Sequence, residues 1–256
     1  MMMASMKGDG FVKQENLKVY DQRYQLIYES GIQFWNQHEP HPQLLHLVEG
    51  LAEGDRCIEF GCGEGHESRV LASKGLHVTA IDLSPIVIKH AISNTHKDLD
   101  VNYLVGDVTD LTNLGIADHT YELAVNVGCL HMMAEDEDRI AHLKEVKRVL
   151  KSGGLFFLQN GLALDSVVSK STEEEHILEQ LQSFHKQQLK PGELICMQVS
   201  TPKGIKKVEV PLCPAGKTLS IQGYVTELEA AGFSIMFTEQ GGGANMPFEA
   251  IIVARA

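Results

Sequence analysis

The middle of the chain alternates short apolar runs with amphipathic segments. The apolar runs predict five strands: Arg56–Phe60, His77–Ile81, Val101–Val105, Leu123–Val127 and Leu155–Gln159. The segments with helical spacing are Ser68–Ser73, a helix that Ser84-Pro85 opens and that runs to about Asn94, and Asp136–Lys151, which we expect Gly153-Gly154 to end. Strands that alternate with helices imply right-handed crossovers and a parallel sheet covered on both faces.

The last third of the chain departs from this alternation. The pattern predicts a polar helix, a strand pair joined through a Pro-Lys-Gly turn, and then a helix and two strands: Thr172–Gln188, Glu193–Val199 with Lys206–Val210, Ser220–Ala231, Phe233–Thr238 and Phe248–Ala254. A final helix and two strands suit a sheet closed by an antiparallel hairpin. We therefore expect an α/β fold with a seven-stranded, doubly wound, mostly parallel sheet and an insertion after the fifth strand, at about 161–219.

The chain before the sheet has its own pattern. Leu44, Leu45, Leu47, Val48 and Leu51 have the spacing of an amphipathic helix. We expect a helical cap segment over residues 1–40, one large domain over 41–256, and a disordered leader at Met1–Gly10.

Composition limits the classes of partner. The chain has 22 Lys and Arg against 34 Asp and Glu, a formal net charge of −12, and no dense basic run, which disfavours nucleic acid as a partner. Five scattered cysteines indicate free thiols in a reducing compartment. No apolar run approaches a membrane span, and the histidines, among them His41 and His46, lack the spacing of a zinc site. We expect a cytoplasmic protein with no membrane partner and no metal.

Candidate chemistry gathers where the predicted strands end. Gly61, Gly63 and Gly65 follow the first strand and precede a helix, so the backbone can turn sharply and approach a ligand closely. Asp82 ends the second strand, where a carboxylate can accept both hydroxyls of a ribose, and Asp107 follows the third, where a carboxylate can accept an adenine amino group. These positions share the carboxyl edge of the sheet, where open α/β sheets bind ligands.

A dinucleotide is the natural competitor for this loop. The G-x-G-x-x-G pattern that starts at Gly61 requires a glycine at position 66, which is His66. The acids Glu59, Glu64, Asp82 and Asp107 also favour a cationic ligand and repel phosphate. The pattern indicates a nucleoside that carries positive charge and no pyrophosphate.

The stretch from Ile58 to Gly65 resembles motif I of the class I S-adenosylmethionine (SAM)-dependent methyltransferases. The resemblance covers about Gln43–Gln159. It implies SAM as cofactor and S-adenosylhomocysteine as product. It also implies cofactor contacts for residues along this edge. The methionine part is contacted by Glu59, Gly61, Cys62 and Gly63, the ribose by Asp82 and Leu83, and the adenine by Asp107 and Val108. Asn126 and Val127, where the fourth strand ends, are further implied cofactor contacts.

The segment Gly31–Pro42 is similar to the stretch before motif I in thiopurine, thiol/halide and tellurite methyltransferases. That resemblance implies that Trp35 packs at the SAM site, although a single Trp is also typical of ordinary core packing. The insertion is longer than the compact tellurite type has, so the substrate stays open.

Methyl transfer from a sulfonium requires an aligned nucleophile and exclusion of water. His131, after the fourth strand, is the candidate general base; the alternative is a histidine that packs the loop. His38, His131 and Met132 are the candidate substrate contacts. Cys129 is interpreted as a small buried side chain.

Several functions are compatible with these patterns. The first is methyl transfer to a small-molecule acceptor through sulfur, oxygen or nitrogen. The alternatives are a protein or RNA methyltransferase and a non-catalytic SAM-binding module. The insertion is expected to act as a lid that selects the substrate or as a dimer surface, so the chain is a monomer or a homodimer.

Overall fold

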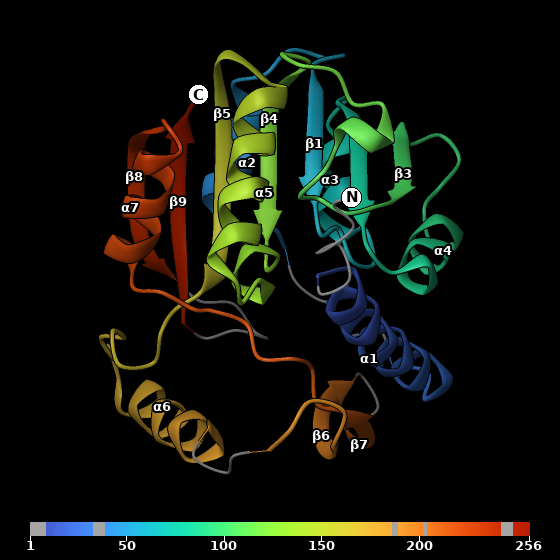
Figure 1. Ribbon diagram of the computed structural model, residues 1–256, viewed down its shortest axis with the longest axis vertical. Coiled ribbons are helices and arrows are strands. Elements are labelled where there is room, and N and C mark those ends of the chain that lie inside the picture. Colours follow the sequence, from blue (N-terminus) through green and yellow to red (C-terminus); the bar gives the residue numbers. More distant parts are fainter. Residues whose placement is uncertain (1–8, 33–38, 186–188, 202–203, 242–247) are drawn as a thin grey trace, which may run out of the picture.

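A computed structural model describes residues 9–32, 39–185, 189–201, 204–241 and 248–256. A seven-stranded sheet forms the centre of the molecule, in the order β3-β2-β1-β4-β5-β9-β8 (Figure 1). The strands are β1 Arg56–Phe60, β2 His77–Asp82, β3 Val101–Val105, β4 Tyr121–Val127, β5 Leu150–Gly161, β8 Ser234–Gly241 and β9 Glu249–Arg255. The first five are parallel, and β9 pairs antiparallel with both β5 and β8. The predicted fold class is confirmed.

Helices cover both faces of the sheet (Figure 1). The helices are α1 Asp9–Glu29, α2 Pro42–Glu49, α3 His66–Ser73, α4 Pro85–Ser93, α5 Asp136–Val149, α6 Thr172–His185 and α7 Ile221–Ala230, with 3-10 turns η1 Thr112–Leu114 and η2 Leu130–Met132. Successive side chains of a strand point to opposite faces, so each strand contributes to two cores. Ile58 and Phe60 pack with α5 and α7, whereas Cys57 packs with α2, α3 and α4.

Local sequence explains where several helices begin. Ser84 caps α4 by accepting the N–H of Val87, with Pro85 in the first turn, and Ser220 caps α7 by accepting the N–H of Gly223. Both N-terminal ends lie where the sequence predicts them.

Some predicted boundaries are wrong. Helix α5 ends at Val149 and not at Lys151, and Gly153 and Gly154 lie inside β5. The pairing of β5 with β4 shifts between Leu150 and Leu155, so the glycines serve an irregular strand start and not a helix end. Helix α1 begins at Asp9, within the segment expected to be disordered, and residues 1–8 lie outside the described part.

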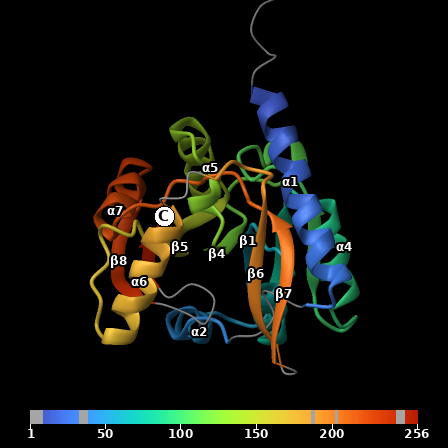
Figure 2. The ribbon, with the colours of Figure 1, turned by 90° about the horizontal axis from the view of Figure 1, so that it is seen from below.

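Helix α1 and a separate hairpin lie next to the carboxyl ends of the parallel strands (Figures 1 and 2). The hairpin consists of β6 Leu194–Thr201 and β7 Gly204–Pro211. Ile27 and Ile32 form a small core with Val210 of β7, and Arg23 donates to the carbonyl of Pro211 over 2.8 Å. The apolar side of the hairpin is therefore buried against α1.

The insertion returns to the sheet after the hairpin. Leu219 bridges Leu162 in parallel, and the N–H of Lys217 donates to the carbonyl of His131 over 2.8 Å. A Cβ on Gly216 would overlap that carbonyl, so only a glycine lets the chain pass so closely. The end of the insertion thus lies directly on the loop that follows β4.

Candidate active site

The glycine turn joins β1 to α3 at the carboxyl edge. Gly61, Gly63 and Gly65 have φ of +67°, +51° and +72°, which L side chains rarely adopt. A Cβ on Gly61 would lie 2.6 Å from the Cβ of Cys129, and one on Gly65 would overlap Tyr103, whereas one on Gly63 would meet nothing within 4 Å. The turn is tightly packed at both ends and open in its middle.

Asp82 faces this turn from the end of β2. Its carboxylate accepts the N–H of Gly63 at 3.0 Å and the N–H of Ser84 at 2.9 Å. Burial raises the pKa of Asp82, and these two backbone donors oppose the rise. The Ser84 hydroxyl also donates to Asp21 of α1, which connects the helix to this edge.

The next strand ends in a second carboxylate. Asp107 accepts the N–H and the hydroxyl of Thr109 at 2.9 and 2.7 Å, and the carbonyl of Val108 accepts from His142 at 3.1 Å. Leu83, after Asp82, keeps 37% of its surface exposed, so an apolar side chain is available at the same edge.

Glu59 lies deeper than the other acids. It is 1% exposed, and its carboxylate accepts the hydroxyl of Ser68 from α3. Burial and the nearby Glu67 raise its pKa well above the usual value. Its direct contact with a methionine group stays a prediction. Burial likewise raises the pKa of the Cys62 and Cys129 thiols, so neither is a thiolate at neutral pH.

Two buried asparagines organise the loop after β4. Asn126 is fully buried, and its Oδ1 accepts the N–H groups of Cys129 and Leu130 at 3.2 and 3.1 Å. Since this side chain is committed to the loop, a contact between Asn126 and a nucleoside would come from its backbone. Val127 ends the strand and is half-buried.

His131 lies at the base of this loop, beside the insertion. Its Nδ1 is 2.9 Å from Oδ1 of Asn160. Burial lowers the pKa of His131 to about 4, with a further lowering from Arg139, so the ring is neutral at pH 7. Met132 follows it and is half-buried.

Sequence reasoning missed one wall of the site. Tyr20 of α1 is close enough to Asp82, Cys129 and Cys213 to interact with them electrostatically, and burial raises its pKa. One turn further on, half-buried Tyr24 interacts with Asp82. The available signal was the spacing of Tyr20, Tyr24 and Tyr28, which four-residue steps place on one face of a helix.

Two predicted contacts, Trp35 and His38, lie outside the described residues. His41 is described, and its Nδ1 accepts the N–H of Gln43 at 3.2 Å, so it caps α2. Among the described residues, no three His, Cys, Asp or Glu side chains gather closely enough to hold a metal. Within that same part of the chain, no helix has the length and apolar character needed to cross a membrane.

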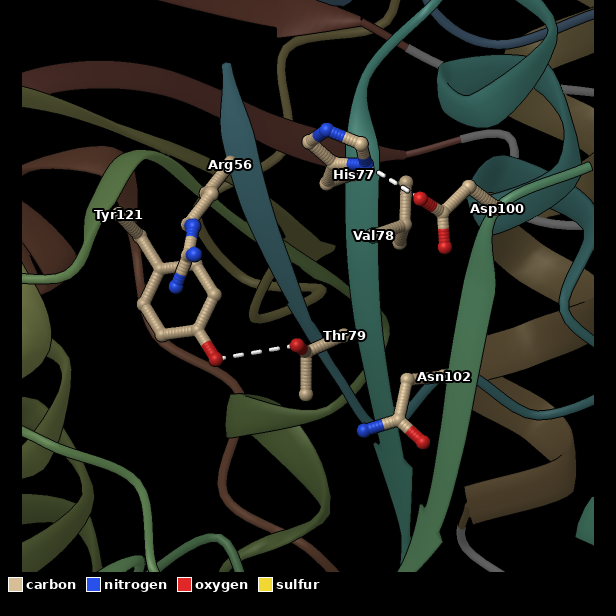
Figure 3. A pocket seen from close by; sticks show the side chains of 7 residues that line it. All are labelled: Arg56, His77, Val78, Thr79, Asp100, Asn102 and Tyr121. Carbon is tan, nitrogen blue, oxygen red and sulfur yellow. Dashed lines mark hydrogen bonds and ion pairs between the residues drawn. The ribbon is translucent and has the colours of Figure 1, made fainter. Parts of the chain in front are cut away.

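The opposite edge of the sheet carries a groove of a different kind (Figure 3). Its lining comes from the starts of the strands: Arg56, His77, Val78, Thr79, Asp100, Asn102 and Tyr121. His77 pairs there with Asp100 in an exposed position, and Tyr121 donates to Thr79 over 3.0 Å. Four of the lining side chains are therefore paired with one another.

The residues of the carboxyl edge fit SAM. A Cβ on Gly63 would occupy the open middle of the turn, so the backbone there has room for a ligand at close range. The carboxylates of Asp82 and Asp107 match hydroxyl and amino donors and attract a sulfonium.

A family model described as a methyltransferase domain matches residues 58–158. That match contains the glycine turn, both edge carboxylates and His131. The chain has the class I methyltransferase fold. The matched family is in keeping with a SAM-dependent methyltransferase, and the residues of the carboxyl edge fit SAM as the cofactor.

Similar proteins agree on the fold and differ in acceptor. The ubiquinone biosynthesis O-methyltransferase of Xanthomonas oryzae is 34% identical over 124 residues, or 47% of this chain and 50% of that protein. The Xylella fastidiosa enzyme of the same name is 33% identical over 136 residues, 49% and 53% of the two chains. The chain thus spans about half the length of these curated relatives. The solved 1,6-didemethyltoxoflavin-N1-methyltransferase of Burkholderia thailandensis has a TM-score of 0.62 at 15% identity, over 99% of this chain and 92% of that one.

Proposed function

We propose that the protein transfers a methyl group from SAM to an oxygen atom of a small-molecule acceptor. The observation that carries the proposal is the glycine turn with the Asp82 carboxylate directed into it. The oxygen acceptor is supported by the relatives that bear the name O-methyltransferase and by the neutral imidazole of His131 near the turn. The thiopurine, thiol/halide and tellurite subgroup gains no specific support from these relatives.

In the proposed mechanism, one set of residues binds the cofactor and another aligns and deprotonates the acceptor. SAM supplies a methyl group on a positively charged sulfur, which is already a strong electrophile. Asp82 and Asp107 bind the nucleoside, and the surrounding carboxylates attract its charge. Tyr20 and Tyr24 of α1 exclude water and align the acceptor over the loop after β4. His131 receives the acceptor proton.

The insertion is proposed to select the acceptor. Its end lies on the carbonyl of His131 through Lys217, and Cys213 lies near Tyr20. Side chains between Cys213 and Lys217 are therefore proposed to lie near the acceptor, beside His131 and Tyr20, and away from the glycine turn. Replacement of 164–212 by a short linker is expected to keep SAM binding and to abolish transfer, measured by calorimetry and by turnover.

The first experiment is calorimetry with SAM and with S-adenosylhomocysteine. Wild-type protein should bind both, and Asp82→Asn should weaken binding by about 100-fold because the ribose loses two charge-assisted hydrogen bonds. Asp100→Asn, which makes the same charge change at the opposite edge, should bind like wild type. Equal affinity in Asp82→Asn and wild type would refute the site.

The second experiment identifies the acceptor with labelled SAM. A screen would compare phenols and catechols with amines, thiols, halides and tellurite. Transfer to phenols alone supports the oxygen proposal, and transfer to amines or thiols replaces it. Transfer to RNA or to protein would move the chain to those alternatives, against its charge of −12. Tight SAM binding with no transfer to any class would favour the non-catalytic module.

A further inference from the structure

Two asparagines lie side by side at the carboxyl ends of the central strands. Asn126 of β4 and Asn160 of β5 are both fully buried, and Nδ2 of Asn160 donates to Oδ1 of Asn126 over 3.0 Å. Buried amides inside an apolar sheet are costly unless each polar atom is paired. Their partners therefore reveal what this pair stabilises.

Backbone donors fix the orientation of Asn126. Oδ1 accepts two backbone N–H groups, from Cys129 and Leu130, so the oxygen must face the loop. Nδ2 then points to Nε2 of His142 at 2.9 Å, and Nδ1 of His142 donates to the carbonyl of Val108. Burial lowers the pKa of His142 to about 4, so this ring is neutral and fits the arrangement.

The orientation of Asn160 follows from the same logic. Its Nδ2 is used by Asn126, and its Oδ1 accepts the backbone N–H of His131 at 2.8 Å. The same oxygen lies 2.9 Å from Nδ1 of His131. An amide oxygen has no hydrogen to give, so a hydrogen bond between these two atoms requires the hydrogen on Nδ1. The N–H of Gly161 also donates toward Nδ1, over 3.2 Å, so this nitrogen faces one donor and one acceptor. The contact with the amide oxygen is the shorter of the two, which favours a hydrogen on Nδ1.

We propose that Asn160 is a positioning residue that holds His131 in the Nδ1–H tautomer and so leaves Nε2 as the proton acceptor. The proposal rests on the proposed function for its catalytic meaning. In the transfer step the carbon–sulfur bond of the sulfonium breaks and the acceptor oxygen–carbon bond forms. The hydroxyl proton passes to Nε2, and the resulting imidazolium keeps its Nδ1–H on Asn160 until Nε2 releases the proton to water.

The surroundings keep the histidine ready to accept a proton. Burial and, to a smaller extent, Arg139 of α5 lower the pKa of His131, so its ring is neutral, and Glu227 of α7 pairs with Arg139. Lys217 contacts the histidine carbonyl through its backbone, and its ammonium pairs with Asp136. Tyr224 of α7 donates to the carbonyl of Gly161. None of these groups offers an acceptor that competes with Asn160 for Nδ1.

The test reads the tautomer directly. Nitrogen-15 NMR of the protein without SAM, with the His131 signals assigned through His131→Gln, should show a protonated Nδ1 and an unprotonated Nε2. Asn160→Leu removes the acceptor and should give a mixture of tautomers, together with a kcat about 10- to 100-fold lower and an unchanged affinity for SAM. Asn102→Asp is the control for a charge change at an exposed asparagine of the opposite edge and should alter nothing.

A second variant keeps the acceptor while adding charge. Asn160→Asp should retain the Nδ1–H tautomer and raise the pKa of His131, because a carboxylate favours the imidazolium. The acid limb of the kcat profile should then move to higher pH. A protonated Nε2 in wild type, or tautomer and pH profile that do not change in Asn160→Leu, would overturn the proposal. If Asn160→Leu fails to fold, the nitrogen-15 spectrum of the wild type and the pH profile of Asn160→Asp still test the proposal. Absent SAM binding would instead refute the proposed function and leave the tautomer result standing.

Discussion

The two edges of the central sheet are built from the same strands but differ in their chemistry. At the carboxyl edge, glycines adopt positive φ and carboxylates such as that of Glu59 are buried. The buried side chains of Asn126 and Asn160 hydrogen-bond to each other and to the backbone of the loop after β4. At the amino edge, charged side chains such as His77 and Asp100 are exposed and pair across the starts of the strands (Figure 3). Buried polar groups require fixed partners, whereas exposed pairs can be exchanged for water. A groove by itself therefore does not identify a ligand site. Buried polar groups that are held in fixed hydrogen bonds are the better indication.

The largest expected effect comes from the buried ion pair of the carboxyl edge. Arg139 is 1% exposed, pairs with Glu227 at 2.6 Å and donates to the carbonyls of Leu130 and Lys217 on either side of His131. Arg139→Met should lower the free energy of unfolding by about 3–5 kcal/mol, because a carboxylate and three carbonyls, that of Met133 included, lose their partner. Denaturant unfolding measures the change.

The amino edge offers the matched control. Lys151 pairs with Glu122 in a position where its side chain is 49% exposed. Lys151→Met should cost at most about 1 kcal/mol in the same measurement. Similar losses for Lys151→Met and Arg139→Met would remove the energetic difference between the two edges.

The glycine turn supplies the next effect. Gly61→Ala should destabilise the protein by about 2–4 kcal/mol and prevent SAM binding, because alanine is strained at φ +67° and its Cβ would overlap Cys129. Gly115→Ala is the control, since Gly115 has φ +71° with nothing within 4 Å of the added Cβ. It should lose about 1–2 kcal/mol and bind SAM normally. Thermal unfolding measures the loss of stability in both variants, and calorimetry measures their affinity for SAM. Normal SAM binding by Gly61→Ala would contradict a close approach of the ligand to the backbone at this turn.

The smallest effect is a difference in pH dependence between two glutamates. Burial raises the pKa of Glu249, at the carboxyl edge, to about 7. The folded state then holds a proton that the unfolded state lacks between about pH 4.5 and 7, so stability falls as pH rises through this range. Glu249→Gln keeps an acceptor for Gln159 and should remove this fall, with a gain on the order of 2 kcal/mol at pH 8.

Glu122, at the amino edge, should behave in the opposite way. Although burial opposes it, hydrogen bonds from Lys151 and from the N–H of Arg56 lower the pKa of Glu122. Its contribution to stability is therefore present above the unfolded pKa of about 4.5 and is lost as pH falls below it. Glu122→Gln should cost a fraction of a kcal/mol at pH 8. Unfolding free energies measured from pH 4 to 8 check both signs, and equal slopes for the two variants would contradict the comparison.

The sequence alone determined the sheet and the positions of its edge residues. Strand alternation and glycine spacing are local properties, so β1 and β3 have the bounds that the apolar runs predict. The same holds for Gly61, Gly63 and Asp82, since parallel strands bring their carboxyl ends to one edge whatever the details of packing. The end of α5 was misplaced because an irregular strand start depends on pairing with a neighbour and not on the glycines themselves.

Only the tertiary structure decided what covers that edge and what orients the histidine. Tyr20 and Tyr24 lie 60 or so residues before Asp82 in the chain and approach it because α1 packs on the hairpin and on α4. The contact of Asn160 with His131 joins β5 to the loop after β4 through an amide orientation that no spacing along the chain encodes. Contacts between distant segments depend on the whole packed fold, whereas motifs depend on neighbours along the chain.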